Sequence, residues 1–154
     1  MSSTEEPLVH HRIEMEWADN SEKYIQDVKK YCMDKSIRHE AQFKKNKFRY
    51  NCLALPAVVT PILISVITPF IGESSDVILP VVLSGLGILN GVQTFFNYGS
   101  KSQKHNEYSN KYNDLVEDIT TEIMKGETYR ESAEVFCERV KQKKSRMDDG
   151  APDL

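Results

Sequence analysis

Two long apolar runs without any charged residue dominate the pattern of this chain. No Asp, Glu, Lys or Arg occurs in residues 50–72 or in residues 77–100. A helix needs roughly 20 residues to cross a 30 Å hydrocarbon core, and each run is long enough to do so. We therefore predict transmembrane helices at 51–72 and 77–98, joined by a short acidic external loop at 73–76.

A helical hairpin at the centre of a soluble bundle is the alternative to a membrane hairpin. The mean hydropathy of the chain, −0.49, would suit a soluble protein. That average arises because two polar, charge-dense arms flank the apolar runs. Two uncharged runs of this length, joined by so short a turn, are rare in soluble cores, and we therefore favour the membrane.

The basic residues orient the hairpin. The connecting loop carries Glu73 and Asp76 but no Lys or Arg. Short flanks rich in Lys and Arg remain on the cytoplasmic side of a membrane, so we predict that both termini face the cytoplasm. The flanking basic residues are Arg38, Lys44, Lys45, Lys47 and Arg49 before the first span, and Lys101, Lys104 and Lys111 after the second.

Each polar arm carries an apolar seam at helical spacing. We predict cytoplasmic helices at 17–50 and 99–125, each continuous with its span. A lone exposed seam would be an association hazard, so the arms should pack as an antiparallel pair; self-association through the same seams is the alternative. The seam residues are Trp17, Tyr24, Val28 and Tyr31, widened by Ile25 and Cys32, and on the exit helix His105, Tyr108, Tyr112, Leu115 and Ile119.

The remaining segments are a third helix and two tails. Gly126 is predicted to end the exit helix in a left-handed conformation. A capping-box pattern, Thr-Tyr-Arg-Glu, then begins a helix at 128–146, which should fold back on the other two. The polar tails at 1–16 and 147–154 are predicted to be disordered.

The second span has a face of small residues with amide side chains beside it. Small residues let helix backbones approach closely, and Gly87 and Gly91 form a GxxxG pattern. Amides in hydrocarbon should face protein or water, because burying them unpaired is costly. The stripe is either a packing face, within the hairpin or between subunits, or the lining of a pore in an oligomer. Its residues are Ser84, Gly87, Asn90, Gly91, Gln93 and Thr94.

Three prolines lie in the first span. Pro56 and Pro69 are near its ends, whereas Pro61 is central and removes the hydrogen bond to the carbonyl group of Ala57. We predict a kink at Pro61. A kink of this kind either serves as a gating hinge or simply reflects irregular packing.

The chain carries no pattern that indicates an enzyme. Its three cysteines form no CxxC pair, its histidines lack metal-ligand spacing, and no nucleophile elbow, phosphate loop or zinc-protease motif occurs. A net charge of −3 gives no reason to expect a nucleic-acid partner, and the basic residues near the spans suit contact with anionic headgroups. We predict no catalytic residue, no cofactor, no metal and no small-molecule substrate.

Residues 31–124 resemble the SLATT family, whose members have two adjacent spans flanked by cytoplasmic helices. The resemblance rests on the basic-aromatic sequence at 43–50, the short hairpin and the exit-helix row His105, Tyr108, Tyr112, Leu115 and Ile119. It implies either a membrane effector of a nucleotide-signalled defence system, acting as a pore, or a stand-alone protein of the kind found in large DNA viruses. No sensor domain accompanies the hairpin here, which favours the stand-alone kind.

The sequence therefore predicts an all-α, two-span hairpin whose long helices extend into a cytoplasmic helical bundle. We expect a non-enzymatic, oligomeric membrane protein with a structural or scaffolding role. In a virion, the arms would face the capsid side and link the internal membrane to the protein shell. The alternative is a SLATT-like pore or ion channel. The expected partners are the lipid bilayer and further copies of the chain, or other membrane or capsid proteins.

Overall fold

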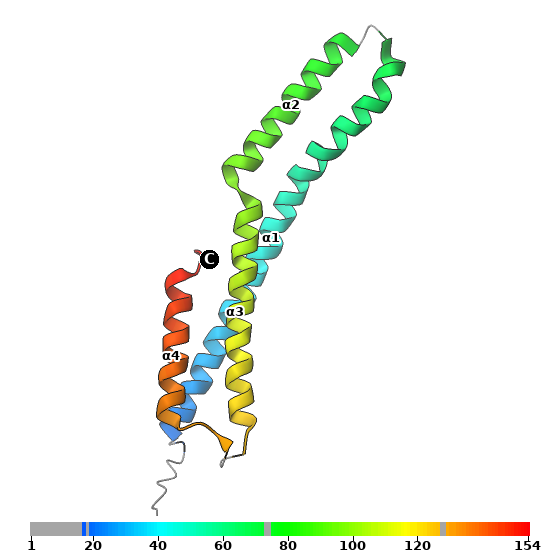
Figure 1. Ribbon diagram of the computed structural model, residues 1–154. Helices are drawn as coiled ribbons and strands as arrows, with labels where there is room; N and C mark the ends of the chain where they lie inside the picture. The colour runs from blue at the N-terminus through cyan, green and yellow to red at the C-terminus, as the bar shows by residue number, and fades with distance from the viewer. Residues whose placement is uncertain (1–16, 18, 73–74, 127–128) are drawn as a thin grey trace, which may run out of the picture.

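The computed structural model describes residues 17, 19–72, 75–126 and 129–154, and within them the chain folds into long helices (Figure 1). The helices are α1 (Asp19–Ile71), α2 (Ser75–Phe96), α3 (Tyr98–Met124) and α4 (Ala133–Gly150). α1 runs the length of the molecule, and α2 and α3 return beside it one after the other. α4 lies alongside the half formed by α3 and the start of α1. The predicted all-α class is confirmed, while the predicted tail at 1–16 lies outside the described residues.

α1 is a single helix that joins the polar arm to the apolar run. It passes through Pro56, Pro61 and Pro69 without ending. The predicted continuity between the entry arm and the first apolar run is therefore confirmed. The kink at Pro61 stays a prediction, since the helix continues on both sides of this residue.

The turn of the hairpin begins with a left-handed residue. Gly72 has a φ of 64°, which glycine adopts without the steric cost that a Cβ would bring. α1 therefore ends just before it, at Ile71. α2 starts at Ser75, inside the segment predicted as a loop at 73–76, of which residues 73–74 are not described.

The chain returns from the hairpin turn as two helices, α2 and α3, contrary to the prediction of one helix through 77–125. Asn97 lies between α2 and α3 with φ 48° and ψ 42°, in the left-handed region. Asparagine is one of the few non-glycine residues that adopt this conformation readily. Its N–H donates to the Gln93 carbonyl group at 3.0 Å and its carbonyl accepts from Lys101 N–H at 3.1 Å. The chain thus changes direction here while these backbone hydrogen bonds are kept (Figure 1).

The arms pack on each other around one apolar core, which we call the arm core. Phe136 and Val140 of α4 close it from the side, and Trp17 stacks at a tilt on Phe136 with ring centroids 5.5 Å apart. Tyr24 departs from the predicted seam, because its side chain is 38% exposed. Ile25 and Cys32, predicted only to widen the seam, are fully buried instead. The buried residues of the arm core are Ile25, Val28, Cys32, Tyr112, Leu115, Ile119, Phe136 and Val140.

The end of α3 is capped by a side chain and not by a glycine. α3 ends at Met124, and Gly126 does not take the left-handed conformation predicted for it. The Arg130 guanidinium group instead donates to the carbonyl oxygens of Ile123 at 2.6 Å and Lys125 at 3.0 Å. It therefore satisfies carbonyl groups that the end of a helix leaves without partners.

α4 begins and ends later than the predicted helix at 128–146. It spans Ala133–Gly150, so Glu131 of the predicted capping box precedes the helix. The prediction of a disordered tail at 147–154 was wrong for its first residues, which complete the last turn of α4. The segment is short and rich in Asp, but Met147 packs against the arm core and Asp148 is anchored by hydrogen bonds from all three helices of the arms.

Two valines of α4 test whether this helix is held by burial. Val140 is 1% exposed in the arm core, whereas Val135 is 55% exposed on the same helix. We expect Val140→Ala to lower the free energy of unfolding of the arms by about 1.5–3 kcal/mol, because it removes a buried side chain. Val135→Ala should change it little. Denaturant unfolding followed by the fluorescence of Trp17, which contacts Phe136, measures both, and equal effects would contradict the docked position of α4.

Candidate functional site

The apolar hairpin is the part of the molecule least covered by protein. α1 and the α2–α3 return each contain a segment long and apolar enough to cross a membrane, by length and composition. None of the most apolar stretch of α1 is buried, and only 6% of that in the return. Phe70 is 85% exposed and Phe95 83%. The apolar side chains of a hairpin at the centre of a soluble bundle would be mostly covered by protein. Within the described residues, those of this hairpin are mostly exposed.

Within the hairpin, α1 and α2 meet along one face of each helix. Leu86 is the most buried residue of this contact, at 8% exposure. Near the turn the helices leave an apolar cavity of about 180 Å³, lined by residues that include Ile64, Ile67 and Val82. The contact is therefore made by bulky aliphatic side chains.

The predicted small face of α2 does not take part in this contact. At 3.6 residues per turn, Gly87 and Gly91 lie roughly 120–160° around the helix from the side that faces α1. No heavy atom lies within 4 Å of a Cβ built on either glycine. Ser84, Asn90 and Thr94 are also exposed, and only Gln93 is half-buried toward α1. The small face is thus the outer face of the hairpin.

A basic and aromatic layer separates the hairpin from the arms. The Tyr50 ring lies against Gly99, where a Cβ would come within 3.2 Å of it. The Arg49 guanidinium group lies over the Tyr98 ring, 5.6 Å from its centroid. Residues 41–50 and 97–106 carry no acid. Their basic residues, the basic belt, are Lys44, Lys45, Lys47, Arg49, Lys101 and Lys104.

Between this belt and the arm core, α1 and α3 meet through polar side chains. Ser36 and Ser109 exchange hydrogen bonds, each hydroxyl lying 3.1 Å from the other residue's carbonyl oxygen. One turn nearer the hairpin, His39 and His105 face each other with their Nδ1 atoms 3.0 Å apart. These serines and His39 were missed by the sequence reasoning. Their spacing from Ile25, Val28 and Cys32 continues the same helical face and could have identified them.

Asp148 joins α4 to both other helices of the arms. Its Oδ1 accepts hydrogen bonds from the hydroxyl groups of Tyr31 at 3.0 Å and Tyr112 at 2.7 Å, and its Oδ2 accepts from Lys144 at 2.8 Å. Burial would raise the pKa of the Asp148 carboxyl group, but these three donors outweigh it and hold the pKa below its ordinary value. The carboxylate is therefore the ionised centre of a satisfied network.

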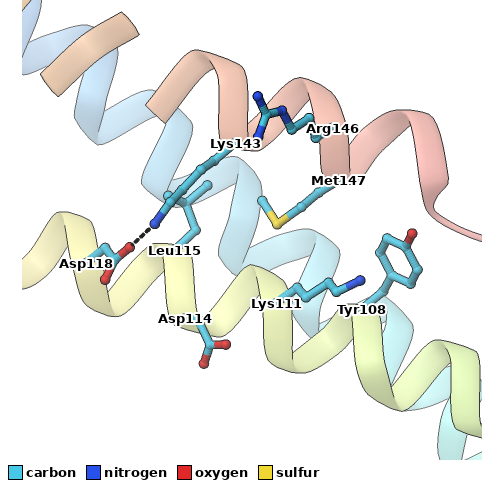
Figure 2. Close-up of a pocket in the computed structure, with 8 residues that line it drawn as sticks. All are labelled: Tyr108, Lys111, Asp114, Leu115, Asp118, Lys143, Arg146 and Met147. Carbon is cyan, nitrogen blue, oxygen red and sulfur yellow. Dashed lines mark hydrogen bonds and ion pairs between the residues drawn. The ribbon is translucent and has the colours of Figure 1, made fainter. Parts of the chain in front are cut away.

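A groove of about 310 Å³ runs between α3 and α4 beside this network (Figure 2). Leu115 and Met147 form its apolar floor, and charged side chains form its rim. Lys143 pairs with Asp118 across the groove at 2.6 Å, so the two sides are tied together. The rim carries charges of both signs, from Lys111, Asp114 and Asp118 on α3 and from Lys143 and Arg146 on α4.

Two observations bear on the chemistry of the described residues. Within them, no group of three or more His, Cys, Asp or Glu side chains is placed to hold a metal ion. Burial raises the pKa of the Cys32 thiol to about 11, which makes it a poor nucleophile. The remaining candidates for function are surfaces: the outer face of α2, the basic belt and the polar contact between α1 and α3.

No protein-family model, curated protein or solved structure matches the chain. The function is therefore argued from the geometry of the surfaces described above.

The Asp148 network predicts how the docking of α4 responds to mutation. Asp148→Ala leaves the buried Tyr112 hydroxyl group without its acceptor and removes hydrogen bonds to a charged group, each worth about 1.5–3 kcal/mol. We expect faster amide hydrogen exchange throughout α4. Asp149→Ala, at an exposed neighbouring position, is the control and should leave exchange unchanged. An α4 equally protected in both variants would show that the network does not hold it.

Proposed function

We propose that this protein is a non-enzymatic, two-pass integral membrane protein that assembles with copies of itself and acts as a scaffold through its arm bundle. The arm bundle comprises α3, α4 and the part of α1 that precedes the hairpin. The observation that carries the proposal is the contrast along α1. Its first half is packed into the arm core, and its second half exposes large aliphatic side chains. Water solvates such a surface poorly, whereas lipid chains solvate it well.

The position of the basic belt supports a defined depth in the bilayer. The belt and its aromatic residues lie where the apolar hairpin meets the charged arms, and lipid headgroups have the complementary chemistry. Only Lys44 of the belt forms an ion pair within the described residues, with Glu40 at 2.7 Å. Under the positive-inside rule we propose that both arms face the cytoplasmic side, or the capsid side of a virion membrane.

The outer face of α2 supports assembly with a second copy. Gly87 and Gly91 give a neighbouring helix room to approach, and no other part of the described chain occupies that room. Asn90 lies beside them, exposed, with an amide that hydrocarbon cannot satisfy. Asn90 lies on the flank of the face that the two glycines form, where a side chain of the neighbouring helix could offer its amide a hydrogen-bond partner.

The alternative function is a SLATT-like pore or ion channel. The observation that favours it is the same Asn90, with Gln93 nearby, because a stripe of amides also suits a water-filled lining. One hairpin cannot enclose a pore, so this function also requires assembly. The two functions therefore differ in conductance and in the role of Asn90, and share the outer face of α2.

Glycine substitutions on α2 test the assembly. Gly87→Leu or Gly91→Leu should abolish or strongly reduce the oligomer, because a leucine side chain holds the neighbouring helix away. Gly85→Leu is the matched control: Gly85 is also open, but lies roughly 160° around the helix from Gly87. Single-molecule photobleaching of labelled protein in lipid bilayers counts the copies. An oligomer that survives both outer-face substitutions would remove this face as the interface.

Asn90→Leu then separates the scaffold from the pore. If Asn90 bonds to a neighbouring helix of the assembly, the substitution weakens assembly and planar bilayers show no conductance with either protein. If Asn90 lines a pore, the wild-type protein conducts, and the variant loses conductance while the oligomer persists. Conductance by the wild-type protein would overturn the scaffold in favour of the channel.

Topology is tested by labelling single cysteines from outside intact membranes. In a Cys52→Ser, Cys137→Ser background, a membrane-impermeant maleimide should modify cysteine placed at Ser75 and leave cysteine placed at Ser145 unmodified. Ser145 is exposed on α4, so it should react once the membrane is permeabilised. Labelling of Ser145→Cys in intact membranes would place the arms on the outer side.

A further inference from the structure

A pair of buried histidines lies between α1 and α3, next to the hairpin. His39 is 0% exposed and His105 is 6% exposed. Their Nδ1 atoms are 3.0 Å apart, which is a hydrogen-bond distance. Neither the assembly face nor the basic belt uses these residues, so their burial is not explained by the proposed function.

Burial of the second nitrogen of His39 fixes where the protons lie. His39 Nε2 is buried without a hydrogen-bond partner. A proton on it would be an orphan donor, which costs more than an unpaired acceptor in the same place. We therefore assign the proton of His39 to Nδ1, where it donates to His105 Nδ1. His105 then carries its own proton on Nε2, and both rings are neutral.

Neither ring of the pair is hydrogen-bonded to a carboxylate among the described residues, so an imidazolium ion here would lack an anionic partner. On α1 the charged neighbour is Lys35, whose charge disfavours a second positive charge on His39. α3 contributes the rings of Tyr108 and Tyr112, with centroids 6.1 and 5.6 Å from that of His39.

The carboxylates nearby are all engaged elsewhere. From α4, Asp148 is bonded to Tyr31, Tyr112 and Lys144. On α1 and α3, the acids closest in sequence to the two histidines form ion pairs one turn along their own helix, Glu40 with Lys44 and Glu107 with Lys111.

We propose that His39 and His105 form an acid-sensitive latch, closed while both rings are neutral, whose protonation separates α1 from α3 next to the hairpin. A proton added to His105 Nδ1 turns the acceptor of the hydrogen bond into a second donor. A proton added to His39 Nε2 creates a buried charge with no partner. Either event removes the contact or makes it repulsive, and opening lets water solvate the charged rings.

The direction of the pH dependence follows from linkage. Burial lowers the pKa of both rings, and for His39 the charges of His105 and Lys35 lower it further. In the open state the histidines have an ordinary pKa of about 6.5, so the open state binds more protons than the closed state. The latch is fully closed above about pH 6.5 and weakens as the pH falls below it. At pH 5.5 each histidine that stays neutral when closed raises the open population by up to about tenfold.

Opening is confined to the segment between the basic belt and the serine pair. Beyond Ser36 and Ser109, α1 and α3 are held by the arm core, which contains no histidine. α3 can pivot relative to α2 at Asn97, where the helical path is already broken. The latch thus controls how far the two arms diverge as they leave the hairpin.

Hydrogen exchange of the full chain in phosphatidylcholine nanodiscs tests the latch at pH 7.5 and 5.5, with rates corrected for intrinsic chemical exchange. We expect amides at 36–47 and 102–109 to exchange faster at pH 5.5, by up to about a hundredfold if both rings act. Amides of the arm core, such as those around Ile119, should change little. Equal protection of 36–47 at the two pH values would overturn the proposal.

Two variants separate a titrating latch from ordinary packing. Ser109→Ala lies one turn from His105 and carries no titratable group, so it should speed exchange at both pH values and keep the acid response. His39→Leu combined with His105→Leu should abolish the acid response. An acid response that persists in the double variant would assign it to another group and overturn the latch.

The wild-type protein also gives a direct readout that needs no variant. In ¹⁵N-histidine NMR spectra at pH 7.5, His39 should be the Nδ1–H tautomer, and both rings should titrate below pH 6.5. Titration of either ring at or above 6.5 would refute the proposal even if the double variant failed to fold.

Discussion

α1 is one uninterrupted helix with two different halves. Its first half packs against α3 and α4, whereas the side chains of its second half are mostly exposed. This continuity is the constraint on which the rest of the structure depends. Because the helix does not break, the arms and the hairpin cannot be separate domains on a flexible linker. The boundary between their two environments must fall at one level of α1, and the basic belt marks that level on both α1 and α3. In the proposed bilayer, a position along α1 would therefore correspond to a depth in the membrane.

The contacts between α1 and α3 change in kind along this axis. Far from the hairpin, Ile25, Val28 and Cys32 are fully or nearly fully buried against apolar side chains. Nearer to it, the interface is polar. Apolar packing tolerates no water and opens only with the whole core, whereas polar pairs have an alternative partner in water at modest net cost. The arms are consequently fastened at their far end and adjustable near the hairpin.

The sequence predicted those features that follow from periodicity and from charge. The absence of charge in 50–72 and 77–100 predicted both apolar helices, and the 3–4 spacing of Tyr112, Leu115 and Ile119 predicted the packed face of α3. Local rules were less reliable. The Gly126 cap was replaced by the side chain of Arg130, and the segment predicted as a tail at 147–154 begins as helix because Asp148 bonds to two other helices. Neither interaction leaves a local signature in the sequence.

The candidate site was also predicted only in part, because periodicity identifies a helix face but does not say which neighbour that face meets. The small face of α2 was found by its spacing, but whether it turned toward α1 or away from it depends on which side of α2 the aliphatic residues occupy. The packing around Leu86 decided that question. His39 and His105 each looked solitary in the sequence. Their pairing depends on the register between α1 and α3, which a single chain pattern does not specify.

The two sides of the hairpin are connected to the arms in different ways, and this asymmetry limits how any signal can travel. On the entry side, α1 is continuous, so a rotation of the arm is carried directly into the apolar half. On the exit side, the left-handed Asn97 separates α2 from α3, and its backbone hydrogen bonds to Gln93 and Lys101 span the junction. Under the proposed latch, divergence of the arms near the hairpin would move α1 relative to α2, along the contact made by Leu86. The outer face of α2 points away from that contact, and an oligomer built on this face would keep its interface while α1 shifts at its periphery.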